Sequence, residues 1–164
     1  MHRGRFEQVG APQDVYELPA TEFVASFLGA SNLLDGEIES VDGGVAKVAL
    51  AAGGAVSVPA SRLPEGGGPV RLGVRPEKLH IRPSSGDANG HHNSIDAVVS
   101  ISTYTGVSTS YECTTPDAAT VVVYVQNLAA SQPAIGAGSP VRLTWDPEHT
   151  FAVKRSTEAE GTST

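Results

Sequence analysis

The sequence has little cysteine, few aromatic residues and few basic residues. Its single cysteine, Cys113, cannot form a disulfide within the chain, so no oxidising compartment is implied. Aromatic residues make up 5% of the chain, so any core must be built mainly from aliphatic side chains. Lysine and arginine number 11 against 18 aspartate and glutamate residues, which gives a net charge of -7. Binding to a phosphate backbone needs a clustered basic surface, so we expect no nucleic-acid partner.

Long apolar segments are absent too. No apolar run approaches the ~20 residues that cross a bilayer as a helix. The first residues, Met1 to Arg5, lack the apolar run of a signal peptide. We therefore expect a cytoplasmic protein with no direct membrane insertion, which meets a membrane only through a partner.

Motifs of catalysis and cofactor binding are missing as well. The chain has neither the Gly-x-x-x-x-Gly-Lys-Ser/Thr phosphate loop nor the Gly-x-Ser-x-Gly elbow. His91 and His92 are adjacent but have no further ligand at a suitable spacing, so no metal site is predicted. Cys113 has no basic neighbour that would activate it as a nucleophile. These residues predict a binding or regulatory module, with no catalytic, cofactor-binding or metal-ligating residue.

The N-terminal part of the chain has the pattern of two short helices. Pro12 suits the first position of a helix that continues to residue 18. Thr21 is a favourable N-cap for a second helix, in which Phe23 and Phe27 are four residues apart and share an apolar face. Helices this short are not stable alone. Their apolar face must pack either on the β-rich remainder of the chain or on another domain.

From residue 33 onward the pattern is that of short strands joined by turns. For example, Ile95, Ala97, Val99 and Ile101 fall on one face of a strand, and Asp96, Val98, Ser100 and Ser102 fall on the other. Two β-rich blocks, residues 33–82 and 95–155, flank a polar loop over residues 83–94, and a polar tail over residues 156–164 is expected to be disordered. We predict an all-β, OB-like barrel of about ten short strands, preceded by a short helical segment. The blocks could form two small barrels or one shared barrel.

The segment from Gly4 to Asn32 resembles the region that follows the ATPase domain in import-type ATP-binding-cassette (ABC) subunits. That family reads Gly-x-Ile-x-Gln-x-Gly-Thr-Pro-x-x-Ile-Tyr-x-x-Pro-x-x-x-Phe-Val-Ala-x-Phe-Ile-Gly-x-x-Asn. The matching residues here are Gly4, Phe6, Gln8, Gly10, Pro12, Val15, Tyr16, Pro19, Phe23, Val24, Ala25, Phe27, Gly29 and Asn32. Ala11 departs from the usual Thr or Ser.

The β-rich remainder resembles the accessory TOBE (transport-associated oligonucleotide/oligosaccharide-binding-like) domain of the same family. The resemblance is carried by Gly73-Val74-Arg75-Pro76-Glu77, by the Tyr104-Thr105-Gly106 turn and by the segment from Val141 to Glu148. The Ser31-Asn32 pair and the ending from Trp145 to His149 look most like the polyamine (spermidine/putrescine) branch.

This resemblance implies a function. Residues 1–32 would be the end of an ATPase domain and a helical hinge, and residues 33–155 a TOBE-like domain for regulation and dimerisation. The implied partners are the family's ATPase domain, a second copy and the transporter's membrane subunits, at the cytoplasmic face of the plasma membrane. ATP and Mg would bind in the ATPase domain, whose Walker A, signature and Walker B motifs are absent from these residues, so the chain itself is not expected to be an enzyme. The alternative is a small-ligand sensor for an oxyanion or a sugar.

The resemblance also suggests which residues matter. The candidate interface residues are Arg75, Glu77, Tyr104, Gly106 and Trp145. For Arg75 and Glu77 the alternative is a bracing role within the barrel, and for Trp145 it is core packing.

Four residues of the helical segment are expected to pack on the ATPase domain and to be exposed in this chain: Val15, Tyr16, Phe23 and Phe27. Full burial of these side chains against residues 37–155 would exclude the hinge hypothesis.

Overall fold

The computed structural model describes residues 4–85, 92–128 and 135–154. Part of the loop predicted over residues 83–94, including His91, lies outside the described residues, as do residues 1–3, 129–134 and the predicted tail. Neither helix in the described ranges has the length and apolar character needed to span a membrane.

Two six-residue helices precede the strands. α1 spans Pro12–Glu17 and begins with the proline, whose missing N–H costs nothing at this position. α2 spans Glu22–Phe27, and the Thr21 side chain accepts the backbone N–H of Val24 at 3.3 Å as its N-cap. Both helices lie where the residue pattern predicts them.

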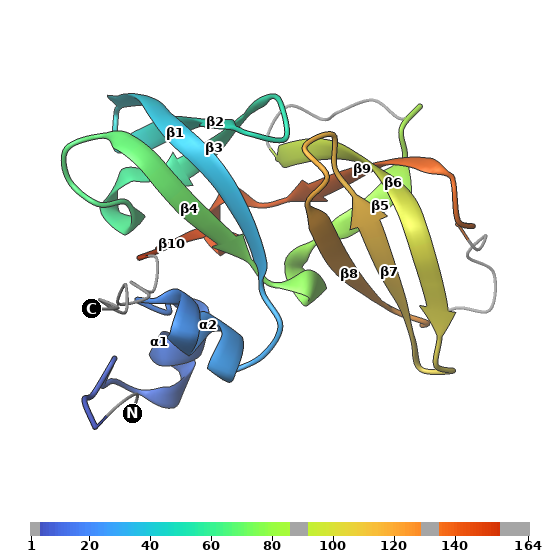
Figure 1. The fold of residues 1–164 in the computed structure, drawn as a ribbon, viewed down its shortest axis with the longest axis horizontal. Helices are drawn as coiled ribbons and strands as arrows, with labels where there is room; N and C mark the ends of the chain where they lie inside the picture. The colour runs from blue at the N-terminus through green and yellow to red at the C-terminus, as the bar shows by residue number, and fades with distance from the viewer. Residues whose placement is uncertain (1–3, 86–91, 129–134, 155–164) are drawn as a thin grey trace, which may run out of the picture.

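Ten strands in the described ranges form two antiparallel sheets (Figure 1). Sheet 1 has the order β10-β4-β1-β2-β3, and sheet 2 has the order β5-β9-β6-β7-β8. The strands of sheet 1 are β1 (Asn32–Asp42), β2 (Val45–Leu50), β3 (Ala55–Pro59), β4 (Gly68–Val74) and β10 (Phe151–Val153). The strands of sheet 2 are β5 (His80–Pro83), β6 (Asn93–Tyr104), β7 (Ser108–Thr114), β8 (Thr120–Gln126) and β9 (Pro140–Trp145).

Three 3-10 helices lie between strands: η1 (Ala60–Arg62), η2 (Pro76–Lys78) and η3 (Pro147–His149).

The two predicted β blocks exchange their last strands. β5 follows β4 in the chain but pairs with β9 in sheet 2, while β10 follows β9 but pairs with β4 in sheet 1. Each crossing passes through a 3-10 helix that begins with proline, η2 in the first block and η3 in the second. The blocks are therefore intertwined and do not form two independent barrels.

The sheets repeat each other in register as well as in order. Residues Pro69–Leu72 of β4 and Pro140–Leu143 of β9 have the same sequence, Pro-Val-Arg-Leu. Arg71 lies opposite Asp35 of β1, and Arg142 lies opposite Asp96 of β6. The long first strand of each block also carries an irregularity at the same place, after Ile38 in β1 and after Val99 in β6. The fold is an internal duplication.

Two asparagines fasten each sheet to the other at equivalent positions. The Asn32 amide nitrogen donates to the Val122 carbonyl, and its oxygen accepts the Val122 N–H, both at 2.8 Å. Asn93 makes the same pair of bonds with Ser57, again at 2.8 Å each. Each asparagine thus acts like one more strand residue against an edge strand of the opposite sheet, β8 or β3.

One hydrophobic cluster joins both sheets. It consists mainly of aliphatic residues, as the scarcity of aromatics predicts, and includes Val48 and Leu72 from sheet 1 and Val123 and Leu143 from sheet 2. Trp145, with no exposed area, is its largest member. The shared core means that the two sheets form one unit, and the predicted all-β class is confirmed.

Candidate functional site

The most distinctive polar arrangement lies where the helical segment meets the end of β4. Arg75 follows this strand directly and is the N-cap residue of η2. Its side chain is 97% buried, at 3% relative exposure. A buried guanidinium must be surrounded by acceptors, because an isolated buried charge is costly. The acceptors of its two terminal nitrogens, Nη1 and Nη2, come from α1, α2 and the turn that follows α2.

Arg75 donates hydrogen bonds to carbonyl groups at the C-terminal end of α2. Its Nη1 donates to the Ala25 carbonyl at 3.0 Å, to the Gly29 and Ala30 carbonyls at 3.2 Å each, and to the Ser31 Oγ at 2.6 Å. The last carbonyls of a helix have no partner within the helix and form the negative end of its dipole. A cation placed there supplies both hydrogen bonds and favourable charge.

The same guanidinium also holds α1. Nη2 donates to the Tyr16 carbonyl at 2.8 Å, and the guanidinium carbon lies 4.2 Å from the centroid of the Tyr16 ring. The Tyr16 hydroxyl donates to Glu77 Oε1 at 2.5 Å. This hydrogen bond, followed by burial and by the charge of Glu77, raises the pKa of Tyr16, while Arg75 opposes the rise. Tyr16 therefore contacts both Arg75 and Glu77, which flank Pro76 in the Gly-Val-Arg-Pro-Glu motif.

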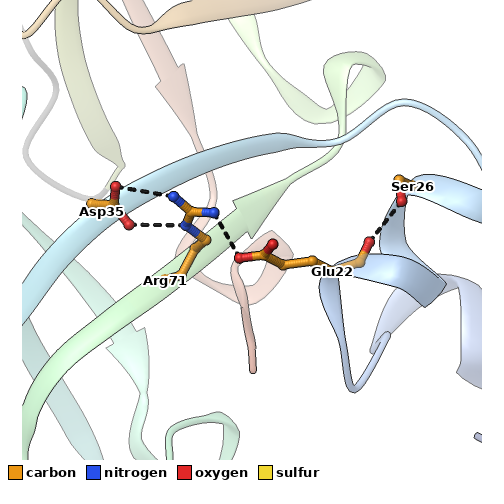
Figure 2. Close-up of polar contacts among 4 residues, drawn as sticks. All are labelled: Glu22, Ser26, Asp35 and Arg71. Carbon is orange, nitrogen blue, oxygen red and sulfur yellow. Dashed lines mark hydrogen bonds and ion pairs between the residues drawn. The ribbon is translucent and has the colours of Figure 1, made fainter. Parts of the chain in front are cut away.

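A second arginine binds the start of α2 (Figure 2). Arg71 of β4 donates through Nε and Nη2 to the two carboxylate oxygens of Asp35, at 2.9 and 3.2 Å, and through Nη1 to Glu22 at 2.6 Å. The bonds to Asp35, and next those to Glu22, raise the pKa of Arg71. Figure 2 also shows the Ser26 hydroxyl, which donates back to the Glu22 carbonyl at 2.8 Å. The two ends of α2 are thus bound by two arginines, one within β4 and one directly after it.

Backbone pairing adds a third attachment. The N–H of Glu22 donates to the Lys154 carbonyl at 3.3 Å, and the N–H of Lys154 donates to the Ala20 carbonyl at 3.1 Å. The residue before α2 therefore continues sheet 1 beyond β10 by one parallel bridge, between Thr21 and Lys154.

A small apolar cluster lies beneath these polar contacts. Ala25 of α2 packs with Phe151 and Val153 of β10, and Leu33 of β1 contributes to the cluster. The Phe151 ring covers Gly73, where a Cβ atom would lie 2.1 Å from a ring carbon. The glycine of the Gly-Val-Arg-Pro-Glu motif is therefore required by the ring that crosses it.

Much of the apolar surface of the helical segment stays uncovered. Phe27 is 76% exposed, and its ring stacks on that of Phe23, with a centroid distance of 5.9 Å. Val15, Tyr16 and Phe23 are half-buried. The full burial that would exclude the hinge hypothesis is not observed, and packing on an ATPase domain stays a prediction.

The candidate interface residues lie in three different places. Arg75 is buried and Glu77 is exposed, and both belong to the junction described above. Tyr104 is 73% exposed, and Gly106, with φ of 85°, occupies the turn that follows it between β6 and β7, at the end of sheet 2 far from the helices (Figure 1). Trp145 lies in the core, where its indole N–H donates to the Thr150 hydroxyl at 2.8 Å. A role of these five residues at an interface stays a prediction.

Sequence reasoning missed the Arg71, Asp35 and Glu22 cluster and the paired asparagines. The signal was present, because Pro-Val-Arg-Leu occurs twice and Pro-Glu follows it at the same distance, as Pro76-Glu77 and Pro147-Glu148. A search for internal repeats would have aligned Arg71 with Arg142. Within the described ranges, no group of three or more histidine, cysteine or acidic side chains could hold a metal ion.

Comparison with known proteins identifies the family to which the chain belongs. Residues 72–153, half of the chain, match the TOBE domain family. The relatives include two spermidine/putrescine import ATP-binding proteins named PotA. The one from Acidothermus cellulolyticus is 36% identical over 153 residues, which cover 92% of this chain and 39% of that protein. The one from Rubrobacter xylanophilus is 37% identical over 151 residues, which cover 91% of this chain and 38% of that protein.

Among solved structures, the fold is similar to that of the cytoplasmic molybdate-binding protein ModG, with a TM-score of 0.63 and 14% sequence identity. The match covers 74% of this chain and 94% of that one, and it shows a shared β fold. The PotA relatives are longer than this chain, which spans about two fifths of their length. From the family match, the motif that carries Arg75 and the fold, we conclude that the chain belongs to the TOBE domain family.

Proposed function

We propose that this chain is the C-terminal regulatory domain of an ABC import ATPase subunit that serves a polyamine or a related small solute. The names of the PotA relatives support this substrate class. In this proposal, ATP and Mg bind to an ATPase domain, and this chain neither binds nor hydrolyses ATP. Its partners are that ATPase domain, a second copy of the subunit and the membrane subunits, at the cytoplasmic face of the membrane.

The observation that carries the proposal is the buried Arg75 at the junction. Its bonds reach Ala25 in α2 and Tyr16 in α1, so a displacement of either helix must strain the end of β4. The helices in turn expose Phe27, which offers an apolar contact to a neighbouring domain. The junction can therefore transmit a movement of an ATPase domain to the β domain, and a movement of the β domain to an ATPase domain.

A chimera tests this role. In the Acidothermus cellulolyticus relative, residues 4–164 of this chain would replace the corresponding C-terminal region. Spermidine uptake would then be measured in cells that have no other spermidine importer. We expect uptake well above that of the same protein with the region deleted. A chimera that hydrolyses ATP but takes up no more spermidine than the deletion would refute the proposal.

A second variant separates coupling from folding. In the chimera with Arg75→Gln, we expect ATP hydrolysis to continue while uptake per ATP falls, because the junction is loosened. Arg62→Gln is the matched control, since Arg62 bonds to Glu148 and to the Thr150 carbonyl and makes no described bond to α1 or α2. Equal uptake per ATP in both variants would argue against Arg75 as the coupling residue.

Small-ligand sensing is the second candidate function. It is favoured by a cavity of about 660 Å³ between the edge strands of sheet 2, lined by Leu79, Tyr111, Tyr124 and Gln126 among others. A thermal-shift screen of the chain against polyamines, sugars and oxyanions tests it. No shift with any of them would remove this candidate.

A further inference from the structure

Because the fold is duplicated, sheet 2 has an arginine at the position that Arg71 occupies on sheet 1. The arginine on sheet 2 lacks one of the partners that Arg71 has. Arg71 and Arg142 occupy equivalent positions, and each donates through Nε to the aspartate opposite at 2.9 Å, Asp35 or Asp96. On sheet 1 a third group joins the pair, because the Glu22 carboxylate of α2 accepts from Arg71 Nη1 at 2.6 Å. Sheet 2 has no such third group among the described residues, and Arg142 makes only its bond to Asp96 there.

The neighbouring strand increases the positive charge of this site. Arg82 of β5 lies directly opposite Arg142, whereas the equivalent neighbour of Arg71 on β10 is Val153. Residues directly opposite in antiparallel strands share a face, and like charges there destabilise the pair. Arg82 makes no hydrogen bond or ion pair with the described residues. This face of sheet 2 therefore carries two arginines in line with one aspartate across β5, β9 and β6, in a chain whose net charge is -7.

An apolar groove adjoins Arg142. Its volume is about 540 Å³, and its lining includes Val98, Pro116 and Pro140 beside Asp96 and Arg142. The Val98 side chain is 45% exposed there. A charged end beside an apolar floor fits a carboxylate that is followed by an apolar side chain.

The chain itself contains that combination, on the other sheet. At the start of α2, Glu22 binds Arg71 and is followed by Phe23. We propose that the outer face of sheet 2, at Arg82, Arg142 and the adjoining groove, binds an acidic segment of a partner protein. A carboxylate of that segment takes the place on Arg142 that Glu22 takes on Arg71, and an adjacent apolar side chain lies in the groove. The site does not depend on the function proposed above.

This docking is weaker than that of α2 on sheet 1. The counterpart of Arg75 at the end of β9 is Asp146, whose side chain caps η3 by accepting the N–H of Glu148 at 2.9 Å. A carboxylate cannot donate to the carbonyls at the end of a helix, so sheet 2 lacks the buried anchor. Binding at Arg142 is therefore reversible and, being an exposed ionic contact, is weakened by salt.

A titration followed by NMR tests the site. The probe is an acetylated, amidated peptide with the sequence of residues 20–30, added to the nitrogen-15-labelled chain at low salt. We expect shifts at Arg142 Nε and at the Asp96 amide. Affinity should fall about tenfold for the chain with Arg142→Gln, and at least about fivefold for the peptide with Glu22→Gln, since each loses the ionic contact. Arg82→Gln, on an edge strand, is a second variant if Arg142→Gln does not fold.

The matched control is Lys47→Gln, which removes the same charge from the other sheet, where Lys47 pairs with Glu39 at 3.3 Å. This variant should bind the peptide as the parent chain does. Equal affinity of the Arg142→Gln and parent chains would overturn the proposal, and so would shifts confined to sheet 1 around Arg71. If free glutamate or inorganic phosphate produced the same shifts at the same concentration, the site would be one for small anions and the proposal would be wrong.

Discussion

Replacing Arg75 by glutamine should release the helical segment while the two sheets stay folded. Helices of six residues have no stability of their own, so α1 and α2 stay ordered only through their contacts with the β domain. Glutamine is shorter and uncharged, and it cannot reach Ala25 and Tyr16 at once. The segment, and not the core, should therefore respond to the change.

The size of the effect follows from the bonds that are lost. The two shortest bonds from Arg75 to helix carbonyls are those to Ala25 at 3.0 Å and to Tyr16 at 2.8 Å. A hydrogen bond to a charged group contributes about 1.5–3 kcal/mol net. Water can reach the freed carbonyls once the segment moves, so the lower bound applies to each bond. The loss is then about 3 kcal/mol, or more than 100-fold in the local opening equilibrium.

Hydrogen exchange measures this opening directly. In Arg75→Gln, protection of the Ala25 and Leu28 amides should fall about 100-fold, while protection of Val48 and Val123 in the two sheets should be unchanged. Arg62→Gln serves as the control and should leave all four amides as in the parent chain. Unchanged protection at Ala25 would refute the reasoning, and so would equal losses in the helices and the sheets, because Arg75 would then support the whole fold.

Three further predictions concern packing and titration. Gly73→Ala forces the Phe151 ring from its place and should lower the free energy of unfolding by about 1–3 kcal/mol in urea; an unchanged midpoint would contradict the close contact. Because the hydrogen bond to Glu77 raises the pKa of Tyr16 in the folded state, its contribution to stability is complete below the ordinary tyrosine pKa of about 10 and is lost as pH rises above it. Stability should therefore fall more steeply above about pH 10 in the parent chain than in Tyr16→Phe, and parallel curves would argue against this bond. Burial raises the pKa of the Cys113 thiol to about 11, so alkylation at pH 8 should be at least about 100-fold slower in the folded chain than in denaturant, and equal rates would show that the thiol is accessible.

Local structure was predictable because short-range physics determines it. The alternation of Ile95, Ala97, Val99 and Ile101 predicts one buried face. The structure buries the first three, but Ile101 is 50% exposed, because the pairing of β6 with β7 shifts register after Val99. The proline start of α1 and the threonine cap of α2 likewise depend only on neighbouring residues. Periodicity therefore gave both the strands and the fold class.

Pairing between distant strands was not predictable in the same way. Alternation says which face of a strand is buried but not which strand lies beside it, so the exchange of β5 and β10 between the sheets could not be read from the chain. The same limit applies to the candidate site. Arg75 could be assigned to a motif, but its burial depends on α1, α2 and β10 meeting at the end of β4.

The duplication explains why, in the described part of the chain, α-helices pack on sheet 1 and not on sheet 2. At the end of the fourth strand of each block, the residue before Pro-Glu is Arg75 in one case and Asp146 in the other. An arginine there can donate to the carbonyls of a helix end, whereas an aspartate can only accept, and it caps its own 3-10 helix. The residues on which a helix could pack differ too. Phe151 and Val153 of β10 are apolar, whereas the corresponding residues of β5 are His80 and Arg82. One copy of the repeat is thus built to hold a segment of its own chain, while the other presents charge to solvent, so the two sheets of one fold serve different contacts.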